Sequence, residues 1–197
     1  MEKGFDIRKE FANFGIDLPP KRVHFKIPDA ELAFKKTMGC VLRSISCDYK
    51  HLTPYNDVIA WMKNNNGLGL LLMGRCGNGK TVIAKYVLPY IFQKMFKKKF
   101  KVFDASTFRS IDVLDELEKY RYIVIDDIGV ENTIVEYGNK VDVFARFMDI
   151  VEKQNKLIIL TTNLDASSLE ERYGTRVADR LANTTKIVGF NEKSFRR

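Results

Sequence analysis

The sequence predicts an α/β fold in which a parallel five-stranded sheet lies between helices. One observation is that apolar, strand-like runs alternate with amphipathic segments along most of the chain, which is typical of a parallel sheet covered on both faces. A second is the pattern Gly74-x-x-x-x-Gly79-Lys80-Thr81, a P-loop, which follows the apolar run 68–73 and precedes a helical segment. Strand, loop and helix therefore come in the order that phosphate binding requires.

The chain before the loop is expected to be helical. Residues 5–14 suit a short helix that a glycine ends, and residues 29–45 carry apolar side chains at helical spacing. A third helix is expected to begin at Thr53-Pro54, where a capping side chain precedes a proline, and to end in the Asn- and Gly-rich run 64–67.

The chain after the loop alternates helices with strands. Pro89 lacks an N–H group, so it should kink the first of these helices or end its first segment near Leu88. Helices are expected at residues 80–97, 107–120, 132–156 and 165–182, and strands at residues 101–105, 122–125, 157–160 and 187–190.

The loop predicts that ATP and Mg²⁺ are the cofactors. Its glycines allow the backbone to fold around phosphate oxygens with N–H groups pointing inward, and the following helix adds positive charge at its N-terminus. Lys80 would reach the β- and γ-phosphates, and the hydroxyl of Thr81 would ligate Mg²⁺. The expected nucleotide-binding residues are Gly74, Gly77, Asn78, Gly79, Lys80, Thr81 and Val82.

Two further strands end in polar side chains. Residues 121–125 lead into the adjacent carboxylates Asp126 and Asp127, and we expect Asp126 to hold Mg²⁺ through water and Asp127 to orient the attacking water. Residues 157–162 lead into Asn163. The carboxyl ends of parallel strands line the ligand crevice, so we expect Asn163 to meet the γ-phosphate or the attacking water.

GTP is the alternative nucleotide, because the chain also contains two strings found in GTPases. Asp126-x-x-Gly129 is one, and Asn139-Lys140-Val141-Asp142 is the other. The second string reads the guanine base only when it follows a buried strand, whereas here nine residues separate it from Gly129 and the region is predicted to be helical. We therefore treat the match as coincidence and keep ATP.

Length and composition suit one ATP-binding domain, residues 54–197, with an N-terminal helical extension, residues 1–53. No apolar run approaches the roughly 20 residues that span a bilayer, and the charged amino terminus lacks the apolar core of a signal peptide, so we expect a cytoplasmic protein without a membrane partner. Three cysteines, one of them inside the P-loop, argue against a disulfide framework. The run Cys40-x6-Cys47-x3-His51 offers one ligand too few for structural zinc.

The net charge of +8 favours a polyanionic partner, and we expect single-stranded DNA. Residues 94–101 interleave lysines with Phe96 and Phe100, as surfaces that bind single strands do, with lysine on phosphate and phenylalanine against bases. The alternative is a solvated helix end with both rings facing the core.

Four strings together resemble the DnaC/DnaI helicase loaders and the related IstB ATPases of transposition, within the AAA+ class, over about residues 50–197. The resemblance implies that Arg176 is an arginine finger acting on ATP held by a neighbouring subunit, that Asn163 is the sensor 1 residue and that Arg196 is the sensor 2 candidate. It also implies a homo-oligomer in the ATP-bound state. The strings are the P-loop, Asp126-Asp-Ile-Gly129, Thr161-Thr-Asn-Leu164 and Tyr173-Gly-Thr-Arg-Val-Ala-Asp-Arg-Leu181.

The resemblance implies an ATPase that uses ATP binding and hydrolysis to control self-assembly and engagement of single-stranded DNA or a replication protein, such as a replicative helicase. Three departures qualify the match: little room for a separate N-terminal domain, no C-terminal helical lid after the last strand, and Asp127 where the family has glutamate, which implies slow hydrolysis. The alternatives are a transposase-partner ATPase, an ATP-gated interaction module with little hydrolysis, and a small-molecule P-loop kinase.

Overall fold

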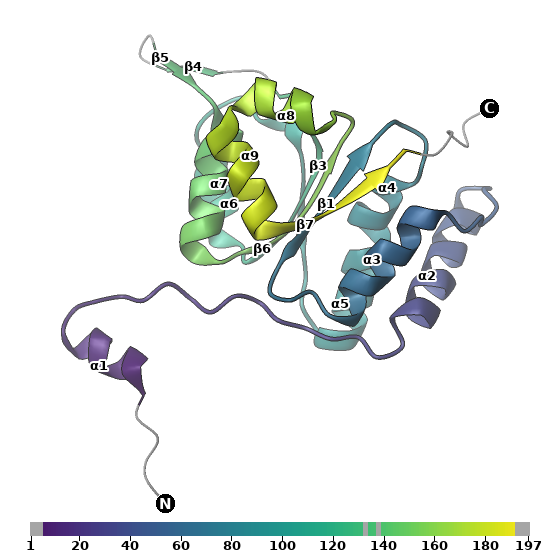
Figure 1. Cartoon of the computed structure of the whole chain (residues 1–197), viewed down its shortest axis with the longest axis horizontal. Helices are drawn as coiled ribbons and strands as arrows, with labels where there is room; N and C mark the ends of the chain where they lie inside the picture. Colours follow the sequence, from purple (N-terminus) through teal and green to yellow (C-terminus); the bar gives the residue numbers. More distant parts are fainter. Residues whose placement is uncertain (1–5, 132–133, 137–138, 192–197) are drawn as a thin grey trace, which may run out of the picture.

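The fold is a single parallel sheet between two layers of helices, seen in a computed structural model that describes residues 6–131, 134–136 and 139–191 (Figure 1). All neighbouring strands of this five-stranded sheet run parallel, in the order β2-β3-β6-β1-β7. The predicted fold class is confirmed. The strands are β1 Gly69–Gly74, β2 Lys101–Asp104, β3 Tyr122–Ile128, β6 Leu157–Thr162 and β7 Thr185–Phe190.

One face of the sheet is covered by the helices that surround the P-loop in sequence. Its core is aromatic: the ring of Phe25 packs edge-on against Trp61 at 5.0 Å and against Phe92 at 4.6 Å between centroids. The domain boundary predicted near residue 53 lies between α2 and α3, and both helices pack in this core. The helices are α2 Ala30–Ser44, α3 Thr53–Lys63, α4 Lys80–Val82, the π-helical turn η1 Ile83–Val87 and α5 Leu88–Phe96.

The opposite face is covered by helices from the second half of the chain. α7 supplies most of this core, because Phe144, Phe147 and Met148 are completely buried against the sheet. Strands buried on both faces carry apolar side chains in nearly every position, which explains why their runs were visible in the sequence. These helices are α6 Val113–Lys119, α7 Val143–Gln154, α8 Ala166–Tyr173 and α9 Thr175–Thr184.

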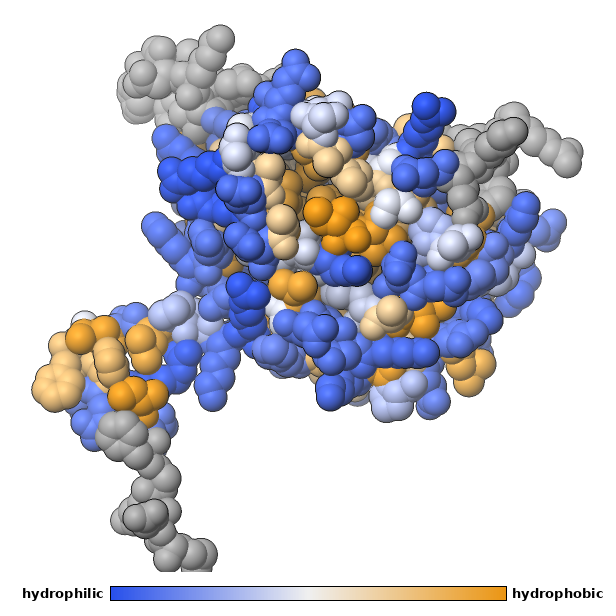
Figure 2. All heavy atoms as spheres, viewed as in Figure 1, coloured by the Kyte–Doolittle hydropathy of each residue, from blue (hydrophilic) through white to orange (hydrophobic). Residues whose placement is uncertain are grey.

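An extended arm runs below the sheet and joins α1 (Ile7–Asn13) to α2 (Figure 1). The body holds the arm by side-chain hydrogen bonds. Asn65 accepts from the Phe25 amide at 3.0 Å and donates to the Val23 carbonyl at 2.8 Å, and Asn155 donates to the Pro20 carbonyl at 2.7 Å. α1 itself buries no residue, and its apolar side chains gather on the surface at the end of the arm (Figure 2).

Two predicted helices are present but interrupted. In the segment 80–97, the Leu88 amide donates to the Ile83 carbonyl, which widens the helix into the π-turn η1 directly before Pro89. This is the disturbance expected near Leu88, since a π-bulge is a common adjustment where the regular helical bonding fails. In the segment 165–182, Gly174 has φ +84° and separates α8 from α9.

The helix predicted from residue 107 begins six residues later than expected, at Val113. Local hydrogen bonds stabilise a different conformation before it. Asp104 accepts from both the amide and the hydroxyl of Ser106, and the Thr107 hydroxyl donates to the Asp104 carbonyl. Short polar side chains compete with the helix in this way, and they hold the short turn η2 Ala105–Thr107.

The helix predicted over residues 132–156 is wrong in its first half. An antiparallel hairpin of β4 Ile134–Glu136 and β5 Asn139–Val141 precedes α7, and Asp142 caps that helix by accepting from the Ala145 amide at 3.0 Å. The β-branched residues of both strands favour extended backbone. The string Asn139-Lys140-Val141-Asp142 therefore lies in a hairpin rather than in a helix. This hairpin is separate from the five-stranded sheet, so the string does not end one of that sheet's strands.

Within the residues that the structure describes, no helix combines the length and the apolar composition needed to cross a membrane.

Candidate nucleotide-binding site

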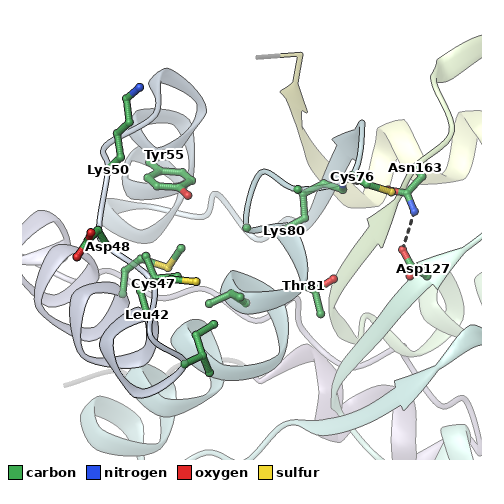
Figure 3. A pocket seen from close by; sticks show the side chains of 15 residues that line it. Leu42, Cys47, Asp48, Lys50, Tyr55, Cys76, Lys80, Thr81, Asp127 and Asn163 are labelled. Atoms are coloured by element: carbon green, nitrogen blue, oxygen red, sulfur yellow. Dashed lines mark hydrogen bonds between the residues drawn. The ribbon is translucent and has the colours of Figure 1, made fainter. Parts of the chain in front are cut away.

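A pocket of about 440 Å³ opens at the carboxyl ends of the central strands (Figure 3). Lys80, Thr81, Asp127 and Asn163, four of the residues predicted to act on the nucleotide, line one side of the pocket, which we call the phosphate side. The opposite side is formed by α2, α3 and the connection between them, which sequence reasoning did not assign to the site. The side chains from that region that Figure 3 labels are Leu42, Cys47, Asp48, Lys50 and Tyr55.

Two glycines of the P-loop are required by close packing as well as by backbone conformation. Gly74 has φ +132°, and a Cβ there would lie 2.3 Å from the carbonyl oxygen of Phe190 on β7. Gly79 has φ +83°, and a Cβ there would lie 2.9 Å from the Tyr55 hydroxyl. Asn78, within the loop, is buried and donates to the same Phe190 carbonyl at 3.4 Å. The loop is thus fixed against β7 and α3 in a conformation open only to glycine at these points.

Oxygen atoms of the described residues hold Lys80 at the mouth of the loop. Its ammonium group donates to the carbonyls of Gly74 and Arg75 at 2.6 and 2.8 Å and to Asn163 Oδ1 at 3.1 Å. The residue is only 5% exposed. A phosphate oxygen entering the loop would exchange places with one of these acceptors, and the phosphate-binding role of Lys80 stays a prediction.

A β-bulge sets the two adjacent carboxylates at the end of β3. The register between β3 and β6 shifts between Ile125 and Ile128, and Asp127 has the left-handed φ of +57°. Thr161 fixes this bulge, since its hydroxyl donates to Asp126 at 2.6 Å and accepts from the Asp127 amide at 2.8 Å. Bulges commonly re-aim side chains at functional sites. Thr161 was not predicted as a site residue, although its position two residues before Asn163 was visible.

Asn163 joins the P-loop to the end of β3. Its amide oxygen accepts from Lys80, and its amide nitrogen donates to Asp127 Oδ1 at 3.1 Å (Figure 3). Burial raises the pKa of Asp127, the negative charge of Asp126 raises it further, and Lys80 opposes both. Asp127 is consequently a stronger base than a free aspartate. Three residues predicted from separate motifs thus lie within one hydrogen-bonded chain.

The donors predicted for Mg²⁺ are oxygen atoms, which this hard cation prefers: the exposed hydroxyl of Thr81 and the buried carboxylate of Asp126. Lys85, which the sequence did not reveal, lies beside them. Its ammonium group is 3.3 Å from Asp126 Oδ2 and 3.8 Å from Asp104. Burial alone would lower the pKa of Lys85, but the charge and hydrogen bond of Asp126 outweigh it and raise the pKa. The residues present fit Mg²⁺. The ammonium group of Lys85 neutralises the charge of the Asp126 carboxylate.

Arg176 stands apart from the pocket of its own chain. Its side chain is 76% exposed on α9, and its guanidinium lies 3.5 Å from Asp149 of α7. The neighbouring Arg180 is 15% exposed and is ion-paired to both Asp149 and Glu152. Arg196 lies outside the described residues, so its predicted role stays a prediction.

A second network links the end of β3 to α8. Glu131 is 4% exposed, and its carboxylate accepts from the Gly129 amide at 2.8 Å and from the Tyr173 hydroxyl. The Arg172 guanidinium donates to the Glu131 carbonyl. Burial, and secondarily the charge of Glu131, raise the pKa of Tyr173. These contacts therefore hold the loop after the paired carboxylates against α8, three residues before Arg176. No sequence motif predicted this link.

The aromatic rings of segment 94–101 face the core, as the alternative interpretation held. Phe100 packs between Phe92 and Tyr122, at 5.0 and 5.7 Å between centroids, and Phe96 lies 5.4 Å from Phe92. These two rings are thus not available to stack on bases, although the lysines of residues 97–99 are exposed.

The sequence model described as novel STAND NTPase 3 matches residues 52–188. No curated protein sequence matches the chain significantly. Among solved structures, the DnaC helicase loader gives a TM-score of 0.53 at 19% identity and covers 73% of this chain and 93% of that chain. DnaI gives 0.50 at 20% identity, with 66% and 73% covered, and AMPPCP-bound DnaA from Aquifex aeolicus gives 0.52 at 13% identity, with 72% and 48% covered. Such identities establish an AAA+-like fold alone.

Proposed function

Because the chain belongs to the novel STAND NTPase 3 family, we propose that it is an ATPase of the helicase-loader kind, in which ATP controls self-assembly and a grip on single-stranded DNA or a replication protein. The observation that carries the proposal is the hydrogen-bonded chain from Lys80 through Asn163 to Asp127. The side-chain amide of Asn163 thus contacts two groups at once: Lys80, proposed to bind phosphate, and Asp127, proposed to orient water.

Each residue of the site has a separate role in this proposal. The loop and Lys80 bind the phosphates, with the γ-phosphate near Asn163. Thr81 and Asp126 would hold Mg²⁺, which supplies positive charge to the phosphate oxygens. Asp127, with its raised pKa, orients the attacking water and accepts its hydrogen bond.

Hydrolysis is proposed to need a second copy of the chain. The pocket of one chain contains no arginine among its described lining residues, whereas Arg176 is exposed on α9. An arginine supplied by a neighbour can stabilise the charge that develops as the terminal phosphate leaves. ATP hydrolysis would then be slow in the isolated chain and depend on assembly.

The DNA-replication role is supported by two observations. The fold is similar to that of the DnaC helicase loader over most of that protein's length, and the net charge of +8 suits a nucleic-acid partner. Fold similarity at 19% identity is an analogy, and function must come from the site. A transposase-partner ATPase would share the same nucleotide chemistry.

The test of the nucleotide role compares wild type, Lys80→Ala and the matched control Lys153→Ala, an exposed lysine on the other face of the sheet. Loss of the ammonium group should weaken ATP binding about 10²-fold, since hydrogen bonds to charged groups are strong, while the control binds normally. Calorimetric titration with ATP measures the affinity. Equal affinity in a folded Lys80→Ala protein would contradict the site.

The test of the ATPase role measures phosphate release against protein concentration, with and without single-stranded DNA. Turnover per chain should rise with concentration and with DNA. ATP binding without turnover at any concentration would instead favour the interaction module. Affinity capture with the Asp127→Asn variant, which should retain ATP, then identifies whether the partner is a helicase or a transposase.

A further inference from the structure

A second cavity of about 860 Å³ lies between α2 and the η1–α5 segment. Among the described residues, none lines both this cavity and the nucleotide pocket, although α2 borders both. Thr37, Cys40 and Val41 face this second cavity, whereas Met38 and Leu42 face the pocket. We call it the α2–α5 groove.

The charge of the α2–α5 groove has one sign. Lys36, Lys85 and Lys94 line it, and no acidic residue does among its described lining residues. The ammonium group of Lys85 is already bound to Asp126. Lys36 and Lys94 are exposed, and neither has an ion pair with any carboxylate in the described part of the chain. An anionic ligand is therefore the complementary occupant.

Two tyrosines present their rings along the same wall. Tyr86 and Tyr90 are 56% and 53% exposed, which is unusual for aromatic residues on a helix that is otherwise packed in the core. They lie four residues apart, about one helical turn, so their side chains occupy the same face. Lys94 continues this row and places its ammonium 5.6 Å from the Tyr90 centroid.

We propose that the α2–α5 groove binds single-stranded DNA, an inference that rests on the nucleic-acid role proposed above and gives it a location. The bases stack on Tyr86 and Tyr90, and the backbone phosphates meet Lys36 and Lys94. Only unpaired bases offer a face to a tyrosine ring, so the ligand is a single strand rather than a duplex. The rings that the sequence singled out, Phe96 and Phe100, are on the same stretch of chain but point into the core.

The first experiment titrates a fluorescein-labelled (dT)12 oligonucleotide by fluorescence anisotropy. Tyr86→Ala/Tyr90→Ala should weaken binding at least about 10-fold, since each base stacked on an aromatic ring contributes measurably, and Tyr86→Phe/Tyr90→Phe should restore it. Lys36→Ala/Lys94→Ala should reduce the slope of log affinity against log salt by about 1.4, the value for two phosphate contacts on a single strand. The matched control Lys119→Ala/Lys153→Ala, two exposed lysines of α6 and α7 on the other face of the sheet, should leave the slope unchanged.

The second experiment uses the native cysteines and needs no mutation. Cys40 lines the groove, whereas Cys47 and Cys76 line the nucleotide pocket, and all three are exposed. Alkylation by iodoacetamide, followed by mass spectrometry, reports each one separately. Bound (dT)12 should slow modification of Cys40 at least severalfold, and bound ATP should slow modification of the other two.

The outcomes separate the groove from the wider function. If (dT)12 binds but Cys40 stays reactive and the tyrosine variant binds fully, DNA lies elsewhere: the groove proposal is overturned and the DNA role stands. If (dT)12 does not bind while ATP still protects Cys47 and Cys76, both DNA proposals are overturned and the nucleotide site stands. If a synthetic peptide of residues 6–18 protects Cys40 and (dT)12 does not, the groove is a protein-docking surface.

Discussion

The nucleotide pocket and the surface of α9 differ in how many contacts their side chains make within one chain. In the pocket, Lys80, Asn163 and Asp127 are already joined by hydrogen bonds of 3.1 Å each. On α9, Arg176 is 76% exposed and is linked to Asp149 only at 3.5 Å. If the pocket binds ATP as proposed, one chain holds the groups for binding, while Arg176, proposed to speed hydrolysis, faces outward.

The largest effect is expected at Arg176. If this side chain completes a neighbour's pocket, Arg176→Ala should bind ATP normally but lose turnover by about 10³-fold or more, since arginine fingers contribute on this scale. Arg146→Ala, an exposed arginine on α7, is the matched control and should keep full turnover. Phosphate-release assays at saturating ATP measure both. Full activity in Arg176→Ala would show that hydrolysis in the nucleotide pocket does not depend on the surface of α9.

Mixing two inactive variants tests whether the regions meet between chains. Lys80→Ala retains Arg176, and Arg176→Ala retains the P-loop, so mixed assemblies contain interfaces in which both are intact. Part of the activity should return, and the recovered fraction should rise with protein concentration. A mixture that stays inactive although mixed assemblies form, as shown by crosslinking, argues against a finger acting between subunits.

A smaller effect is expected from breaking the bridge inside the pocket. Asn163→Ala removes the group that orients both Lys80 and Asp127, so turnover should fall about 10²-fold, as it does when one pre-organised polar group is lost from other active sites. ATP affinity should change much less, because the loop remains. Comparing the turnover number with the affinity from titration separates the two. An equal loss in both would assign Asn163 to binding.

The network between β3 and α8 tests whether the two regions are mechanically connected. Tyr173→Phe leaves the buried Glu131 carboxylate without its hydroxyl donor, which should lower the free energy of unfolding by about 1–3 kcal/mol. Urea denaturation measures this value. In the background Glu131→Gln the same substitution should cost less, because the unsatisfied charge is gone. Equal costs in both backgrounds would show that the two side chains do not interact energetically.

The smallest effects concern pH, and they have opposite signs at two aspartates. The pKa of Asp127 is raised, so the protonated form is favoured on folding, and wild type should lose stability relative to Asp127→Asn as pH rises above about 4. The pKa of Asp165 is lowered by hydrogen bonds from Ser168 and Ser167 at the start of α8. Wild type should therefore exceed Asp165→Asn at neutral pH and lose this advantage as pH falls below about 4. Thermal melts from pH 2.5 to 8 measure both.

The phosphate side of the pocket could be predicted because its signals are local. The P-loop, the paired carboxylates and Asn163 each combine a required residue type with a fixed position after a strand, and parallel strands bring such positions together. The core strands were equally visible, since burial on both faces leaves continuous apolar runs.

The remaining features depend on contacts between distant segments. Lys85 reaches Asp126 across 41 residues, and Thr161 sets a bulge in another strand. The far side of the pocket requires the packing of α2 against α3. The strands β4 and β5 pair where a helix was predicted, because their β-branched residues favour extended backbone. None of these contacts produces a characteristic spacing of residue types in the sequence.

The position of α2 has one more consequence. The helix is a shared wall, with Met38 and Leu42 on the nucleotide pocket and Thr37 and Val41 on the α2–α5 groove. Because close-packed interiors transmit displacements rather than absorb them, a tilt of this helix that narrows one cavity widens the other. If ATP and single-stranded DNA bind these two cavities as proposed, thermodynamic reciprocity requires that each changes the affinity of the other by the same factor. Binding at one cavity would then oppose binding at the other, although the two ligands never touch.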